Sequence, residues 1–145
     1  MLDRLLGFFK SKPPAPKQEP EPDIIRIPGN DRFDTDVVGE SHYQDNLKQI
    51  CGPHDEKGTK VETEARLILD DKNTHDQHAV RVEINGLAVG YLKREMARLY
   101  RAGLSKGNHP RAIGICKARI RGGGVRRGEV FMYGVYLDIP VEFED

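Results

Sequence analysis

The sequence predicts an α+β fold, a small β-barrel of about six strands, OB-like or SH3-like, with two short helices. The first observation is that short runs of β-branched and aromatic residues alternate with turn residues from Ile24 onward. The second is that two separate stretches have the apolar spacing of a helix. The third is the length of 145 residues, which suits a single core of modest size.

Residues 1–23 are predicted to form a tail in front of this barrel. Leu2, Leu5, Leu6 and Phe9 would share one face of a short amphipathic helix, which could contact a membrane surface or a partner protein. The stretch SKPPAPKQEPEPD that follows has the composition of an extended, Pro-rich linker. We therefore assign the folded domain to residues 24–145.

The first elements of the domain are two strands with a helix between them. Residues 32–39 (RFDTDVVG) are predicted to form a strand, and residues 43–52 a short helix that ends at Gly52. Residues 60–69 have the alternation of a strand, with one face made by Val61, Thr63, Ala65, Leu67 and Leu69.

The clearest local feature is a β-hairpin around Asn85-Gly86, because this dipeptide supplies the positive φ angles of a type I′ turn. A two-residue loop predicts three cross-strand pairs: Ile84 with Leu87, Val82 with Val89, and Val80 with Tyr91. All six side chains are therefore expected on the core face, and Tyr91 is expected in the core.

After the hairpin the apolar spacing becomes helical, and Gly103 marks the predicted end of this second helix. Its apolar side is formed by Leu92, Met96, Leu99 and Tyr100, and its outward side by Lys93, Arg94, Arg98 and Arg101. Residues 111–121 and 129–143 are predicted as the last two strands, joined by a flexible basic loop of glycines and arginines at 122–128.

Charge is unevenly distributed, although the formal net charge is zero. Nine Lys and Arg residues and no Asp or Glu lie between Met96 and Gly128, which indicates a surface that could contact phosphates.

Cys51 and Cys116 form no C-x-x-C pair, so neither a redox motif nor a zinc knuckle is indicated. No apolar run reaches the ~20 residues of a membrane span, and the start lacks the apolar stretch of a signal peptide, so a cytoplasmic location is expected.

The stretch NTHDQHAVRVEING places His75, Asp76 and His78 directly before a strand. A hydrolase would need a nucleophile or an activated water as well, but the chain contains neither G-x-S-x-G nor H-E-x-x-H. A zinc site could add Cys51 or His54, yet neighbouring residues of an extended chain point in different directions. Binding of a hydroxyl, base or phosphate makes fewer geometric demands on the same side chains.

Two stretches, VVGESHYQDNLKQICG and LDDKNTHDQHAVRVEINGLAVGYLKREMA, resemble the HIRAN domain. This family of small barrel-like modules occurs at the N-terminus of certain SNF2-type helicase and fork-remodelling proteins and as stand-alone bacterial proteins. The matching blocks are V-V-G-x-x-x-Y, D-x-x-N-x-x-D-x-x-A-V-x-V and V-G-Y-L-x-x-E-x-A. They run from about Asp36 to Arg98, and the later strands carry no sharp motif.

The resemblance implies binding of the 3′-hydroxyl end of single-stranded DNA in a pocket on an OB-like barrel. By position, Asp76 matches the acid that contacts the 3′-hydroxyl, Asn73 lies in the same recognition loop, and Arg94 takes the place of a basic phosphate contact. Tyr43 lies beside the stacking position. His42 and His75 stand where the family's DNA-end binders have tyrosines, and a smaller imidazole ring is expected to stack less strongly.

The sequence thus predicts a module that binds single-stranded DNA, at 3′-hydroxyl ends, without catalysis or a cofactor. Arg126 and Arg127 of the basic loop are expected to contact the nucleic-acid backbone, and a helicase or other repair protein could act in trans. Asn73 and Asp76 could instead only cap a turn. The alternatives are a protein-interaction or scaffolding module that uses the N-terminal helix, and a small metal-dependent hydrolase built on the histidine cluster.

Overall fold

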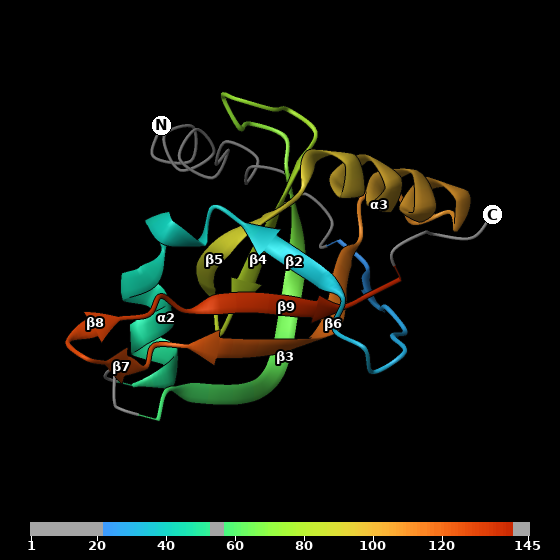
Figure 1. Ribbon diagram of the computed structural model, residues 1–145. Coiled ribbons are helices and arrows are strands. Elements are labelled where there is room, and N and C mark those ends of the chain that lie inside the picture. The colour runs from blue at the N-terminus through green and yellow to red at the C-terminus, as the bar shows by residue number, and fades with distance from the viewer. Residues whose placement is uncertain (1–21, 53–56, 141–145) are drawn as a thin grey trace, which may run out of the picture.

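The structure is a computed structural model that describes residues 22–52 and 57–140 (Figure 1). Its strands are β1 (Ile24–Arg26), β2 (Thr35–Val38), β3 (Thr59–Asp70), β4 (Ala79–Ile84), β5 (Leu87–Leu92), β6 (Ile113–Gly122), β7 (Val125–Arg126), β8 (Glu129–Val130) and β9 (Gly134–Asp138). Its helices are a 3₁₀ turn, η1 (Glu40–His42), then α2 (Gln44–Cys51) and α3 (Arg94–Lys106). The amphipathic helix predicted near residue 2 lies outside the described residues. Within them, no helix has the length and apolarity needed to cross a membrane.

Six antiparallel strands close into a barrel in the order β6, β3, β4, β5, β2, β9 and back to β6. Closure removes the free strand edges that an open sheet of this size would expose. Outside the barrel, β1 pairs in parallel with the start of β6. The predicted α+β class, a small barrel of six strands with two short helices, is confirmed.

The barrel interior is filled by the inward-facing residues of its strands, because side chains alternate between the two faces of a strand. Val80, Val82 and Ile84 of β4 are fully buried, and Ala65 and Leu67 of β3 face them. The two helices add Leu47, Ala97, Tyr100 and Leu104 to the same cluster. Burial of each large apolar side chain contributes roughly 1.5 to 3 kcal/mol, so this cluster fixes both helices on the barrel.

The hairpin forms at Asn85-Gly86 with the expected positive φ angles, but its register differs from the prediction. The observed pairs are Ile84 with Leu87, Glu83 with Ala88, Val82 with Gly90, and Arg81 with Tyr91. Val89 is thus the extra residue of a β-bulge, which shifts all later positions by one. The predicted core position of Tyr91 is wrong, because the bulge turns its side chain to the outer face, and Leu87 is also only partly buried.

Two predicted boundaries are also wrong. Helix α3 continues through Gly103 to Lys106, because Leu104 becomes buried, and this burial outweighs the cost of about 1 kcal/mol for a glycine inside a helix. The predicted strand 129–143 is interrupted: β8 and β9 are separated by Phe131, Met132 and Tyr133.

The basic loop 122–128, predicted to be flexible, contains regular structure. Strands β7 and β8 form a hairpin whose turn residues, Arg127 and Gly128, have positive φ angles.

Candidate functional site

The loop of residues 71–78 joins β3 to β4 at the top of the barrel (Figure 1). Asn73 Oδ1 accepts hydrogen bonds from the backbone N–H groups of His75 (2.9 Å) and Asp76 (3.0 Å). Asp76 Oδ1 in turn accepts one from the N–H of His78 (2.9 Å). The turn-capping roles of Asn73 and Asp76 are therefore real. They use only part of the acceptor capacity of each side chain.

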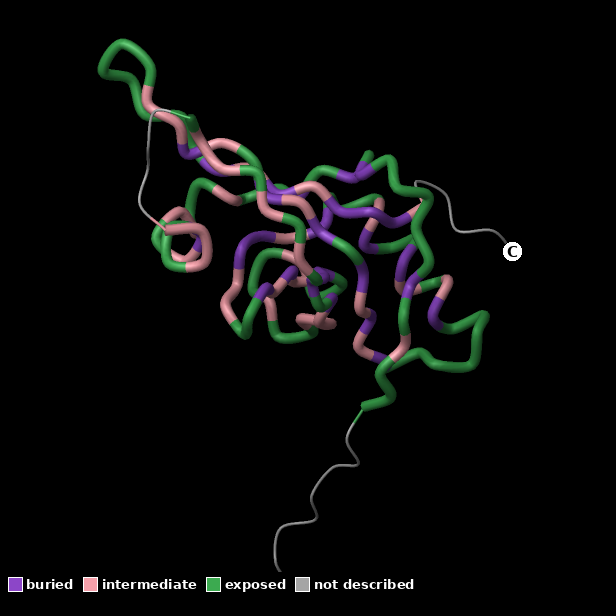
Figure 2. The backbone as a smooth tube through the Cα atoms, turned by 90° about the horizontal axis from the view of Figure 1, so that it is seen from below, coloured by how far each residue is buried: buried purple, intermediate pink, exposed green. Residues whose placement is uncertain are grey.

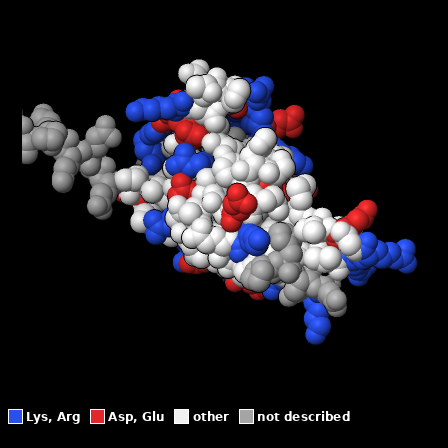
Figure 3. All heavy atoms as spheres, turned by 90° about the vertical axis from the view of Figure 1, so that its left-hand side faces the viewer, with Lys and Arg blue, Asp and Glu red and all other residues white. Residues whose placement is uncertain are grey.

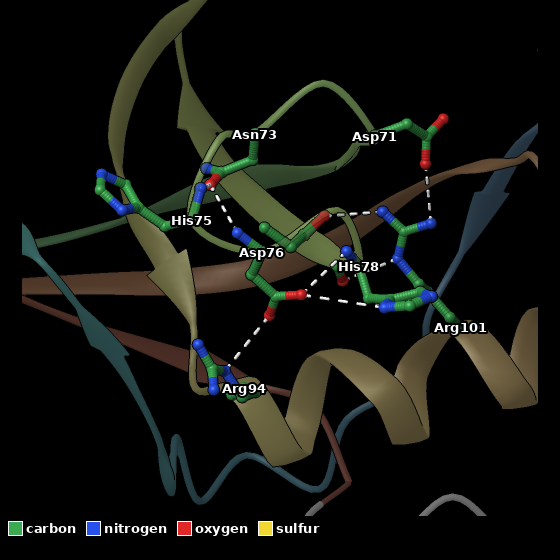
Figure 4. A network of polar contacts seen from close by, with 8 residues as sticks. Asp71, Asn73, His75, Asp76, His78, Arg94 and Arg101 are labelled. Atoms are coloured by element: carbon green, nitrogen blue, oxygen red, sulfur yellow. Dashed lines mark hydrogen bonds and ion pairs between the residues drawn. The ribbon is translucent and has the colours of Figure 1, made fainter.

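Arg101 of α3 ties this loop to the helix (Figure 4). Its guanidinium donates to the carbonyl oxygens of His78 and Ala79, both at 2.8 Å, and to Asp71 Oδ1 at 2.9 Å. The side chain is only 17% exposed, so the prediction that Arg101 faces outward is wrong. Hydrogen bonds from Arg111, and then Arg101, lower the pKa of Asp71 to about 2.

The Asp76 carboxylate faces the exposed start of α3. Its Oδ2 lies 3.5 Å from Nε of Arg94, whose side chain is 63% exposed. The hydrogen bond from the His78 backbone, together with the charges of Arg94 and Arg98, holds the pKa of Asp76 below its ordinary value. Asp76 is thus an ionised acceptor beside cationic side chains that solvent can reach.

Of the two histidines of the loop, His78 approaches Asp76 and His75 does not. His75 is exposed and points away from the Asp76 carboxylate in Figure 4, and His78 Nδ1 lies 3.8 Å from Asp76 Oδ1. Within residues 22–52 and 57–140, no group of three or more His, Cys, Asp or Glu side chains is arranged to hold a metal ion. His54, considered for such a site, lies outside these ranges.

Two tyrosines lie next to the loop on the outer surface of the barrel. The ring centroids of Tyr43 and Tyr91 are 6.5 Å apart, with planes inclined at 50°. The Tyr91 hydroxyl donates to Asp70 Oδ2 (3.0 Å), which also accepts a hydrogen bond from Asn73 Nδ2 (3.3 Å). Asp70 thus links the tyrosine pair to the loop, and burial and this hydrogen bond raise the pKa of Tyr91 to about 12.

Tyr43 stands between η1 and α2, where the backbone is well fixed. Its N–H donates to the carbonyl oxygen of Glu40 (2.9 Å), and its own carbonyl accepts from Leu47 (3.0 Å). The side chain of Gln44 holds the start of α2 against the residue before β9, because it bonds both backbone groups of Tyr133. His42 is exposed and precedes Tyr43 directly.

Arg126 and Arg127 lie at the opposite end of the barrel from the loop. Strand β3 starts at Thr59, opposite Gly122 at the base of the β7–β8 hairpin, and ends at Asp70, opposite Ala79. Its 12 residues correspond to roughly 35 to 40 Å of strand. Figure 3 agrees, because Lys and Arg gather near the top and at the lower right of the face that carries α2. The two predicted groups of site residues therefore form separate surfaces.

The acid-free segment from Met96 to Gly128 does not form one uninterrupted cationic surface. Acids from other elements pair with part of it: Arg101 and Arg111 with Asp71, Lys117 with Asp31, and Arg119 with Glu62. Arg98 remains exposed beside Asp76. The exposed cations near the Asp76 carboxylate are therefore Arg94 and Arg98.

The loop, the tyrosine pair and the first turn of α3 together make the candidate site. The sequence predicted five residues at or next to this site: Asn73, Asp76, Arg94, His42 and Tyr43. It did not predict Tyr91, which the bulge in β5 turns outward, or Asp70, which binds the Tyr91 hydroxyl at the end of β3. Comparisons of the chain with protein-family models, curated proteins and solved structures gave no match.

Proposed function

We propose that this protein is a cytoplasmic DNA-binding module that recognises single-stranded DNA at its 3′-hydroxyl end, in DNA repair or replication-fork processing. The observation that carries the proposal is a series of contacts that joins the tyrosine pair to the loop. The Tyr91 hydroxyl, beside Tyr43, donates to Asp70, and Asp70 also accepts from Asn73. The same loop holds the ionised Asp76 at 3.5 Å from the exposed Arg94. An aromatic surface next to a cation is the combination that single-stranded nucleic acids require.

The tyrosines supply the surface for bases. Their planes are inclined at 50°, so the rings do not stack face to face on each other. Tyr91 is held in place through its hydroxyl on Asp70, which limits the entropy lost when a base binds. Stacking contributes about 1 to 3 kcal/mol per base, independent of sequence. His42, which directly precedes Tyr43 and is exposed, would offer a further ring.

Asp76 supplies the preference for an unmodified end. An ionised carboxylate accepts a hydrogen bond from a hydroxyl but repels a phosphate, and the lowered pKa keeps Asp76 ionised at neutral pH. Arg94 and Arg98 lie close enough to act on the Asp76 carboxylate and are exposed to solvent, so they can contact the adjacent phosphodiester.

The resemblance of the sequence to HIRAN domains supports the same function. Asn73, Asp76 and Arg94 match that family by position, and they lie together in this protein. A module of this kind would deliver a DNA end to a helicase or repair protein in trans, and we propose no chemistry for the module itself.

Fluorescence anisotropy with short single-stranded oligonucleotides tests the proposal. We expect tighter binding of a free 3′-hydroxyl end than of a 3′-phosphorylated end, and no such preference between 5′ ends. Asp76→Asn keeps an oxygen for the His78 N–H but removes the charge, so the preference should shrink while the loop stays folded. Asp31→Asn, at an exposed carboxylate that pairs with Lys117 outside the candidate site, is the matched control. No oligonucleotide binding at low salt would contradict the proposal and favour the protein-interaction alternative.

A further inference from the structure

The β7–β8 hairpin carries the most concentrated exposed apolar surface among the described residues. Val130, Phe131 and Met132 are consecutive and are 58%, 47% and 61% exposed. In Figure 2 the hairpin extends beyond the barrel at the upper left, with exposed residues along its tip. The candidate DNA site lies at the other end of the barrel, so this surface needs a separate explanation.

The register of the hairpin puts apolar side chains on both of its faces. Val130 lies opposite Val125, and the Phe131 N–H donates to the Gly124 carbonyl (2.8 Å). Because side chains alternate along a strand, Val130 and Phe131 point to opposite faces. Phe131 lines a hollow together with Arg126, Arg127 and Glu129. The hairpin is therefore a narrow ribbon with apolar groups on both sides and arginines at its tip.

We propose that this hairpin lies in the plane of the interface of a membrane rich in anionic phospholipids, with Val130, Phe131 and Met132 against the acyl chains and the arginines of the tip among the headgroups. A narrow ribbon in the lipid interface can bury apolar groups on both of its faces, whereas a flat protein surface or a nucleic-acid strand would cover one. Val130 and Met132 also offer no aromatic plane for a base. Arg126 and Arg127 complement anionic headgroups, and the single acid of the hairpin, Glu129, lies opposite Arg126.

The sequence contains a second signal of the same kind, outside the described residues. Leu2, Leu5, Leu6 and Phe9 have the spacing of an apolar helical face, and the same stretch contains Arg4, Lys10 and Lys12. One weak interfacial signal gives marginal, reversible binding, while two together give stable attachment. The hairpin and the N-terminal stretch would act as such a pair, whether or not the protein binds DNA.

Tryptophan fluorescence of the full-length chain tests the insertion directly. Because the protein has no tryptophan, Phe131→Trp introduces a single indole fluorophore into the hairpin. We expect its emission to shift to the blue with vesicles of phosphatidylcholine and phosphatidylglycerol in equal amounts, and not with phosphatidylcholine alone. Leu99→Trp is the matched control, because Leu99 is 45% exposed on α3 and should show no shift. Unshifted emission of the Phe131→Trp variant with both vesicle types would overturn the proposal.

Co-sedimentation with the same vesicles separates the two signals. We expect about a tenfold or greater loss of vesicle binding for Phe131→Ser with Met132→Ser, and for Arg126→Ala with Arg127→Ala. Ile24→Ser, at an exposed apolar residue of β1, should bind like the unmodified chain. Unchanged sedimentation of both hairpin variants would assign any membrane binding to the N-terminus and overturn the role of the hairpin. Oligonucleotide binding lost in these variants, without vesicle binding by the unmodified chain, would assign the hairpin to nucleic acid instead.

Discussion

The aromatic rings of Tyr43 and Tyr91 lie 6.5 Å apart, although one belongs to the start of a helix and the other to a barrel strand. The bulge at Val89 makes this possible, because it moves Tyr91 from the inner to the outer face of β5. Gly39, with a φ of 78°, turns the chain from β2 into η1 and so places Tyr43 over β5. The two tyrosines thereby form one surface.

Removal of either ring is expected to weaken binding of single-stranded DNA. Tyr43→Ala and Tyr91→Ala should each cost about 1 to 3 kcal/mol, roughly 5- to 150-fold in Kd. Tyr91→Phe keeps the ring and loses only the hydrogen bonds of the hydroxyl, including the one to Asp70, so its loss of affinity should be smaller. Anisotropy measures all three, with Ile24→Ala as the control. Equal affinity of Tyr43→Ala and the unmodified chain would exclude Tyr43 from the site.

The barrel was predictable because its signals are local. Asn85-Gly86 identifies a type I′ turn, and the alternation of residues 60–69 identifies a strand, without knowledge of distant neighbours. The bulge has no such signal, since both registers bury Val80 and Val82 equally well. What decides between them is the contact of Gly90 with β2, which forms only when the barrel closes.

The residues of the candidate site also divide into those with a local sequence signal and those whose role depends on distant contacts. Asn73 and Asp76 cap their own loop within a few residues, so the local sequence predicts this capping, while their role in the site was implied by the family resemblance. Helical spacing predicts that Arg101, like Arg98, faces away from the apolar side of the helix. Only the folded chain brings the carbonyl groups of the loop onto Arg101, and spacing cannot reveal this.

Gly90→Ala is expected to destabilise the barrel and the tyrosine pair together. Gly90 has a φ of 154°, and an added Cβ would collide with Val37 Cγ1 and lie 2.6 Å from the Val38 carbonyl oxygen. We expect a loss of about 2 to 4 kcal/mol in the free energy of unfolding, measured with urea. Gly86→Ala, where nothing lies within 4 Å of the added Cβ, isolates the cost of a positive φ. A smaller loss of unfolding free energy for Gly90→Ala than for Gly86→Ala would contradict the close contact of Gly90 with Val37 and Val38.

Arg101→Ala is expected to loosen the loop without unfolding the barrel. It leaves the carbonyl oxygens of His78 and Ala79 without their guanidinium donor and removes one cation from Asp71. The free energy of unfolding should fall by about 1 to 3 kcal/mol, and amide hydrogen exchange should accelerate in residues 71–79. Arg98→Ala, at an exposed position of the same helix, should do neither. Equal exchange rates in both variants would show that Arg101 does not hold the loop.

Glu40→Gln is expected to flatten the pH dependence of stability. Burial, together with the nearby charge of Asp36, raises the pKa of Glu40 to about 7 against the hydrogen bond from Val135. Between about pH 4.5 and about pH 7 the folded state therefore binds more protons than the unfolded state, so stability falls as pH rises. Relative to the unmodified chain, Glu40→Gln should gain about 1 to 3 kcal/mol at about pH 8 and little at about pH 5. Urea titrations check this, and Glu95→Gln, at an exposed carboxylate, should show no such trend.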